Sequence, residues 1–105
     1  ASKHGVAGMT RALAAELGPD GVTVNMMAPG YFTTEINEPI LAKPGYERGV
    51  SNRIPLNRWG EPEEAGGVVA FMASRASGYM NGHVLTVDGG LTETFVLPVD
   101  WDQSA

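Results

Sequence analysis

A short apolar segment that ends at a Pro-Gly pair restricts the fold of this chain more than any other feature. From Val22 to Met27 the chain is rich in β-branched residues in an alternating pattern, which is typical of a β-strand. The run stops at Pro29 and Gly30, and aromatic and hydroxyl residues follow as far as Thr34. The sequence therefore predicts a buried strand that leads into a loop. Ligands of open α/β sheets bind at such carboxyl ends of strands.

The segment before this strand has the period of a helix. Its apolar residues recur at intervals of three and four, so they share one face of a helix over about residues 1–17. A Gly-Pro-Asp-Gly turn at 18–21 ends the helix. Many of its other positions are small, so we expect it to pack on two sides, against its own sheet and against another helix or subunit. The residues of the apolar face are Val6, Met9, Leu13 and Leu17.

The chain beyond Thr34 divides into a flap and a second helix and strand. Residues 35–57 contain three prolines among scattered apolar residues, which predicts a flap with one or two short helices. Pro62 and the acidic residues after it are typical of a helix start. Val84–Val87 form a second strand before an Asp-Gly-Gly turn. This order predicts an α/β fold with a parallel sheet, and since two strands are too few for a doubly wound sheet, we expect further strands upstream.

Several residues of the second half have structural interpretations. We expect Trp59 and Phe71 to lie in the core. Gly66 and Gly67 lie inside the second helix, where each costs about 1 kcal/mol relative to Ala. Their presence predicts that another surface approaches the helix closely at these two positions. Thr34 is placed to cap a short helix of the flap, and this role is compatible with ligand binding.

Composition limits the functions that the chain can have. The 105 residues carry a net charge of -5 without a run of lysine and arginine, so we expect no binding to nucleic acid. No apolar run reaches the roughly 20 residues that cross a bilayer, so we expect no membrane partner. The chain contains no cysteine, which excludes disulfides and thiolate metal sites. The spacing of its histidines and carboxylates does not indicate a metal site. We therefore expect one globular domain in the reducing cytoplasm.

Five motifs, in this order and at this spacing, resemble those of the short-chain dehydrogenase/reductase family. The resemblance covers about residues 1–91 and implies the carboxyl-terminal part of a dinucleotide-binding domain with a Rossmann-type doubly wound parallel sheet. Within the family, the sequences of these motifs are most similar to those of gluconate 5-dehydrogenases and 3-oxoacyl-carrier-protein reductases. The motifs are Ala1-Ser2-Lys3-His4-Gly5-Val6, then Val24-Asn25 with Ala28-Pro29-Gly30 and Thr34, then Arg58-Trp59-Gly60-Glu61-Pro62-Glu63-Glu64, then Asn81-Gly82-His83, and last Val87-Asp88-Gly89-Gly90.

The resemblance implies roles for five residues. The family has a Tyr-x-x-x-Lys pair on one helix, and Lys3 matches this catalytic lysine, which contacts the nicotinamide ribose and lowers the pKa of the tyrosine. Pro29, Gly30 and Thr34 match a Pro-Gly-x-x-x-Thr loop that binds the nicotinamide. In relatives this loop uses backbone near the position of Phe32 and the threonine hydroxyl. The family's catalytic serine and tyrosine and its Gly-rich phosphate turn match no residue of this chain.

These matches imply an NAD(P)-dependent oxidoreductase that interconverts a secondary alcohol and a ketone, with gluconate and 5-ketogluconate as one candidate pair. NAD or NADP is the expected cofactor, and a small alcohol or ketone is the expected substrate. The full-length enzyme is expected to be a homo-oligomer, either a dimer or a tetramer. Residues 35–57 correspond to the substrate lid. Residues 92–105 form a tail that we expect to dock on a neighbouring subunit or to fold over the site.

The chain starts without Met and already at helical spacing, which predicts a fragment of a longer enzyme. Such a fragment is expected to be inactive alone, because the tyrosine and the phosphate turn lie outside it. The alternative interpretation is a non-catalytic truncated protein that acts by binding a partner subunit through its exposed sheet edge.

Overall fold

The structure of the protein, a computed structural model, describes residues 2–94. Most of the tail expected at 92–105 therefore lies outside the described residues, and its docking stays a prediction. The chain divides into two compact units. It passes from the first unit to the second directly after each of its two strands. The first unit joins Ala1–Pro29 and Glu63–Val87, and the second joins Gly30–Pro62 and Asp88–Ala105.

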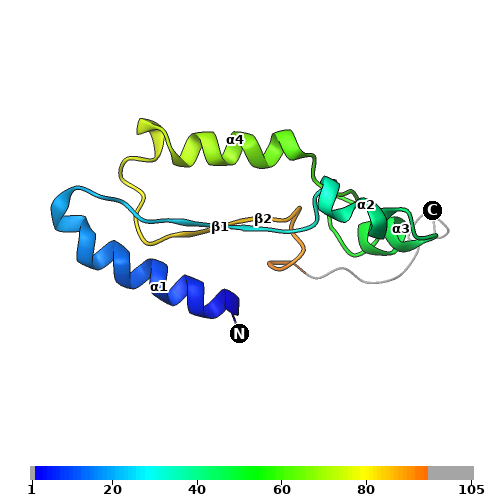
Figure 1. Ribbon diagram of the computed structural model, residues 1–105, viewed down its shortest axis with the longest axis horizontal. Coiled ribbons are helices and arrows are strands. Elements are labelled where there is room, and N and C mark those ends of the chain that lie inside the picture. The colour runs from blue at the N-terminus through cyan, green and yellow to red at the C-terminus, as the bar shows by residue number, and fades with distance from the viewer. Residues whose placement is uncertain (1, 95–105) are drawn as a thin grey trace. The chain divides into compact units, whose positions relative to one another are not determined.

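The first unit is built on two parallel strands. β1 (Met26–Pro29) pairs with β2 (Val84–Val87) residue for residue. α1 (Ser2–Leu17) and α4 (Pro62–Met72) lie on opposite sides of this strand pair (Figure 1). Parallel strands need a crossover connection, and helices on both faces protect such strands from water. The predicted α/β class and the parallel pairing are confirmed.

β1 begins four residues later than predicted. Val22 is 45% exposed, and none of residues 22–25 lies in a strand. The amide of Val24 donates to Asn81 Oδ1 (2.9 Å), and its carbonyl accepts from the amide of Gly82 (2.8 Å). A turn therefore holds the backbone groups that a neighbouring strand would otherwise pair with. The prediction of a buried strand from Val22 is wrong, because the strand is short and its residues are at most half-buried.

α1 forms where predicted, but it packs through a different face. Thr10 and Ala14 are buried, with 6% and 4% exposed, whereas Val6, Met9 and Leu13 are 43%, 58% and 37% exposed. The Thr10 hydroxyl donates to the Val6 carbonyl (2.8 Å), so the buried hydroxyl is satisfied within the helix. Small side chains thus form the packed face. The predicted apolar face is largely exposed, and residues 2–94 do not supply the second packing partner that we expected for it.

Two short 3-10 helices close the turns of the first unit. η1 (Gly18–Asp20) ends α1, and Gly21 follows it in the left-handed conformation with a φ of 79°. The predicted stop at 18–21 is therefore confirmed. η3 (Arg75–Ser77) follows α4, and the Ser74 hydroxyl caps it by accepting from the amide of Ala76 (3.2 Å).

α4 begins at Pro62 as predicted, with two acidic residues in its first turn. None of its residues is buried, and Phe71 is 42% exposed, so the prediction that Phe71 lies in the core is wrong. A Cβ built on Gly66 or Gly67 would meet no atom within 4 Å beyond the helix's own backbone. The described part of the chain therefore does not make the close approach expected at these glycines.

The second unit contains the flap. α2 (Glu38–Leu41) and α3 (Tyr46–Ser51) match the one or two short helices predicted there, and the 3-10 helix η2 (Glu35–Asn37) comes in addition. α2 lies beside α3 in Figure 1. Trp59, predicted to be a core residue, is 4% exposed, so that prediction is confirmed. The buried apolar side chains of this unit are Phe32, Ile54 and Trp59.

Two asparagines connect the turn before β2 to the rest of the first unit. Asn81 Nδ2 donates to the carbonyl of Ala14 in α1 (3.1 Å), while its Oδ1 accepts the bond from the segment before β1 described above. Asn25 Nδ2 donates to the Met80 carbonyl (3.0 Å), and its Oδ1 accepts from the His83 amide (3.0 Å). The two side chains thus satisfy backbone groups that no strand reaches.

We predict that Asn81→Ala lowers the free energy of unfolding by about 1–3 kcal/mol, because the Val24 amide and the part-buried Ala14 carbonyl lose their partner. Urea unfolding followed by circular dichroism measures this change. Asn52→Ala is the matched control, since Asn52 is exposed and its side chain makes no hydrogen bond within residues 2–94. An equal loss in both variants would contradict the role given to Asn81.

Candidate functional site

The loop after β1 approaches the end of β2 so closely that only glycine fits at its first position. A Cβ built on Gly30 would lie 2.6 Å from Asp88 Cβ and 2.9 Å from Asp88 Cα. Real Cβ atoms essentially never come so near, and the Cα that they would meet is part of the backbone. Gly30 is therefore required by its protein neighbour, before any ligand is considered.

Asp88 organises the turn that meets Gly30. Its Oδ1 accepts from the amide of Gly90 (3.0 Å), and its Oδ2 accepts from the amide (3.1 Å) and the hydroxyl (2.7 Å) of Thr92. Burial raises the pKa of Asp88, but the hydrogen bonds to its carboxylate outweigh this effect, so the pKa lies below its ordinary value. Sequence reasoning gave Asp88 no role beyond the motif, although an Asp-Gly-Gly turn after a strand is the signal for such an acceptor.

The ring of Phe32 anchors the loop against the Trp59-Gly60 segment. Phe32 is 7% exposed, and a Cβ built on Gly60 would lie 2.5 Å from its Cε1 atom. The amide of Thr33 donates to the Gly60 carbonyl (3.0 Å), and the amide of Gly60 donates to the Tyr31 carbonyl (2.9 Å). The Arg-Trp-Gly-Glu motif thus pairs with the loop like a short parallel strand.

Two hydrogen-bond donors of the loop find no acceptor in the part of the chain that the structure describes. The Phe32 carbonyl accepts from Asn37 Nδ2 (2.8 Å) and from the Thr34 amide (3.0 Å), and the Thr33 hydroxyl reaches Glu61 Oε2 (3.2 Å). Within residues 2–94, the Phe32 amide and the Thr34 hydroxyl have no hydrogen-bond partner. Thr34 occupies the cap position of η2, as expected, but its side chain makes no capping bond. Both donors remain available to a ligand.

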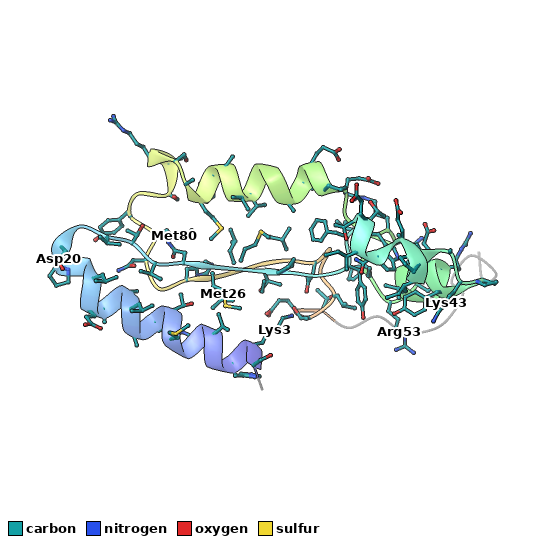
Figure 2. The ribbon with its side chains drawn as sticks, viewed as in Figure 1. Lys3, Asp20, Met26, Lys43, Arg53 and Met80 are labelled. Carbon is teal, nitrogen blue, oxygen red and sulfur yellow. The ribbon has the colours of Figure 1, made fainter. Side chains whose placement is uncertain are left out.

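The structure places the five predicted site residues in both units. Gly30, Phe32 and Thr34 lie together in the second unit, whereas Lys3 and Pro29 belong to the first. Pro29 is the last residue of β1. Lys3 lies in the first turn of α1 (Figure 2) and is exposed, without an ion pair within residues 2–94.

A pocket of about 640 Å³ opens in the second unit between the loop, the flap helices and the segment before α4. Thr33 contributes from the loop, Lys43 and Arg48 from the flap, and Trp59 from the segment that pairs with the loop. The Trp59 Nε1 donates to the Glu47 carbonyl (3.1 Å), which fixes α3 against this segment. A volume of this size suits a small molecule.

Two properties of the described residues bear on partners. No helix among residues 2–94 has the length and apolar character needed to cross a membrane. No three histidine or carboxylate side chains in the same range gather where they could hold a metal ion.

The loop, the lysine and the turn after β2 lie in the part of the chain that matches known proteins. A family model described as enoyl-(acyl carrier protein) reductase matches residues 1–92. The chain belongs to the short-chain dehydrogenase/reductase family. The resemblance noted in the sequence is thereby confirmed.

Relatives within the family agree with this assignment. The chain is 48% identical over 90 residues to the 2-dehydro-3-deoxy-D-gluconate 5-dehydrogenase of Bacillus subtilis (strain 168), covering 86% of this chain and 35% of the relative. It is 47% identical over 92 residues to the cyclohexanol dehydrogenase of Rhodococcus sp. (strain TK6), and the match covers 88% of this chain and 34% of the relative. The chain spans about a third of the length of these relatives.

Solved structures of the family share the fold. The gluconate 5-dehydrogenase of Burkholderia cenocepacia J2315, in complex with NADP and tartrate, superposes with a TM-score of 0.79 at 38% identity. The match covers 85% of this chain and 35% of that one. The two strands and their helices are therefore part of a Rossmann-type dehydrogenase fold, as the resemblance implied.

We predict that Gly30→Ala lowers the free energy of unfolding by about 1–3 kcal/mol, because the added methyl group overlaps the Asp88 backbone. Thermal and urea unfolding measure the change. Gly49→Ala is the matched control. Gly49 lies in α3 with no atom within 4 Å of an added Cβ, so alanine there should raise stability slightly. A Gly30→Ala variant as stable as the unchanged protein would contradict the close approach.

Proposed function

We propose that this chain is the carboxyl-terminal part of an NAD(P)-dependent oxidoreductase that interconverts a secondary alcohol and a ketone. The family match over residues 1–92 supports this proposal, and so do the relatives named as dehydrogenases. Residues 1–91 would form the carboxyl-terminal part of the dinucleotide-binding domain, with residues 35–57 as the substrate lid. A sugar acid such as gluconate is the proposed substrate, because the similar proteins include gluconate 5-dehydrogenases.

The observation that carries the proposal is the pair of unused donors on a fixed loop. The Phe32 amide and the Thr34 hydroxyl lack partners within the described residues, while bonds from Asn37, Gly60 and Thr33 fix the backbone around them. A nicotinamide carboxamide presents an acceptor oxygen that matches these neutral donors. The residues present therefore fit the nicotinamide end of the cofactor. When bound, the nicotinamide supplies or accepts the hydride.

Lys3 holds the other role proposed for this chain. Its ammonium group would donate to the ribose hydroxyls of the cofactor and stabilise a deprotonated tyrosine one helical turn before it. That tyrosine, four positions before Lys3, would exchange the proton with the substrate oxygen. Lys3 is exposed and has no carboxylate partner within residues 2–94, so its charge is not neutralised by the described part of the chain.

We also propose that the enzyme is a homo-oligomer in the cytoplasm. Support for assembly comes from the apolar side chains that α1 and α4 leave uncovered among the described residues, which include Met9 and Val69. Support for the location comes from its expected use of the cell's nicotinamide cofactors.

A chimera tests the function. Its first part is taken from the Bacillus subtilis relative, up to the point where the match begins, and residues 1–105 complete it. Formation of NADH or NADPH at 340 nm with D-gluconate and related alcohols measures activity. We predict that the chimera turns over at least one of these alcohols. Lys3→Ala should lower its kcat by about 10²–10⁴-fold, the usual contribution of general acid–base catalysis.

Arg11→Ala is the matched control, because Arg11 is an exposed cation on the same helix and has no proposed role. The 105-residue chain alone serves as the blank, since it contains no tyrosine at the required position. A chimera that folds but turns over none of the alcohols with either cofactor would contradict the proposed function.

The adjacent threonines of the loop allow a sharper test of cofactor binding. We predict that Thr34→Val raises the Kd for the cofactor about tenfold with little change in stability, because it removes a donor that has no partner in the described chain. Thr33→Val should instead cost about 1 kcal/mol of stability without weakening cofactor binding, since its hydroxyl bonds Glu61 and Gly60. The reverse pattern would reject the assignment of Thr34.

A further inference from the structure

The flap carries most of the positive charge of an acidic chain. The chain as a whole has a net charge of -5 and seven lysines and arginines. Four of these seven cations lie between residues 43 and 58, a stretch with a single acid, Glu47. They recur every fifth residue, so they form no run that composition would reveal. Figure 2 shows Lys43 and Arg53 on this flap. The four cations are Lys43, Arg48, Arg53 and Arg58.

Three of the four cations line the pocket of the second unit, and Arg53 does not. Arg58 donates through one terminal nitrogen to the Trp59 carbonyl (3.1 Å), so part of its bonding capacity is used within the protein. Lys43 and Arg48 are exposed, and neither has a carboxylate partner in the part of the chain that the structure describes. Their charges are therefore available to an anion in the pocket.

The acids of the pocket, Glu47 and Glu61, cancel only part of the charge of its three cations. Glu61 keeps its negative charge, and its Oε2 is turned toward the loop, where it accepts from the Thr33 hydroxyl (3.2 Å). Glu47 follows Tyr46 at the start of α3, and its carbonyl holds the Trp59 indole. Since the cations of the lining outnumber the acids, the pocket favours an anion.

The remaining lining fits a polyhydroxylated ligand. Ser51 and Asn57 offer hydroxyl and amide groups, and Trp59 offers an aromatic wall. Thr33 places the pocket next to the loop, because it lines the pocket and lies between Phe32 and Thr34 in the chain. A substrate in the pocket therefore has the loop proposed for the nicotinamide at one side.

We propose that Lys43 and Arg48 bind the carboxylate of the substrate, so that the enzyme takes a hydroxy acid or an oxo acid and not a neutral alcohol. This inference rests on the proposed function, because it assigns the substrate of the same site. Family membership does not decide the question, since similar relatives include both a gluconate 5-dehydrogenase and a cyclohexanol dehydrogenase. The charge of the pocket decides it in favour of the acid.

The test compares D-gluconate with D-gluconamide, its neutral analogue, in the chimera described above. Lys43→Gln and Arg48→Gln should each raise the KM for D-gluconate about tenfold and leave kcat nearly unchanged, as expected for one charge-assisted hydrogen bond. The KM for D-gluconamide should not change. Arg53→Gln is the matched control, because it removes the same charge from the same flap outside the pocket. It should leave both KM values unchanged.

Calorimetry provides a readout that does not need turnover. D-gluconate is titrated into the chimera loaded with NADPH, where both partners are reduced and no reaction follows. Binding should weaken about tenfold in either pocket variant, and it should weaken further as NaCl is raised. If all three variants lose affinity equally, the effect is a general field of the flap and the pocket assignment is overturned.

Two other results would separate this inference from the proposed function. If the chimera turns over neutral alcohols, and D-gluconamide has the same kcat/KM as D-gluconate, the carboxylate site is overturned and the oxidoreductase function stands. Absence of turnover with every alcohol, together with D-gluconate binding that depends on Lys43 and Arg48, would reject the function and keep the anion site.

Discussion

The contact between Gly30 and Asp88 controls the geometry of the whole loop region. The two parallel strands end side by side, at Pro29 and Val87, and each continues directly into one member of this contact. Because the backbone of Asp88 lies where a side chain of Gly30 would be, the two turns pack directly against each other and no larger residue fits between them. The Asp88 carboxylate, held by amide and hydroxyl donors, fixes the second turn, and through it the start of the loop.

Within the loop, neighbouring residues have opposite tasks. Thr33 directs its hydroxyl to the Gly60 and Glu61 side of the loop, while Thr34 has no hydrogen-bond partner for its hydroxyl among residues 2–94. The ring of Phe32 is buried against Gly60, yet its amide is unpaired within the same residues. An extended backbone turns successive side chains to opposite sides, so one side can be tied to the protein while the other serves a ligand.

Much of this arrangement was predictable from the sequence, because its signals are local. Apolar spacing predicted α1, a proline with acidic residues predicted the start of α4, and a β-branched run predicted β2. The predictions were wrong where contacts between residues distant in sequence determine the structure. Val24 pairs with the side chain of Asn81, far away in sequence, so β1 starts later than its pattern indicates. Periodicity likewise identifies which residues of α1 share a face, but it does not say which face a neighbour covers. The pocket was missed because its cations lie five residues apart and meet only through the fold.

The distribution of charge explains how an acidic protein can favour an acidic substrate. Net charge acts at distances beyond the Debye length of about 8 Å, where salt screens it strongly, whereas a carboxylate in the pocket lies within contact distance of particular side chains. At contact distance the nearest unpaired charges dominate, and in the pocket these include Lys43 and Arg48, which have no carboxylate partner within residues 2–94. The surplus of acids elsewhere in the chain therefore does not oppose binding in the pocket. That surplus also disfavours anions over the rest of the surface, so under the carboxylate proposal the flap would be the part of the chain that selects the substrate.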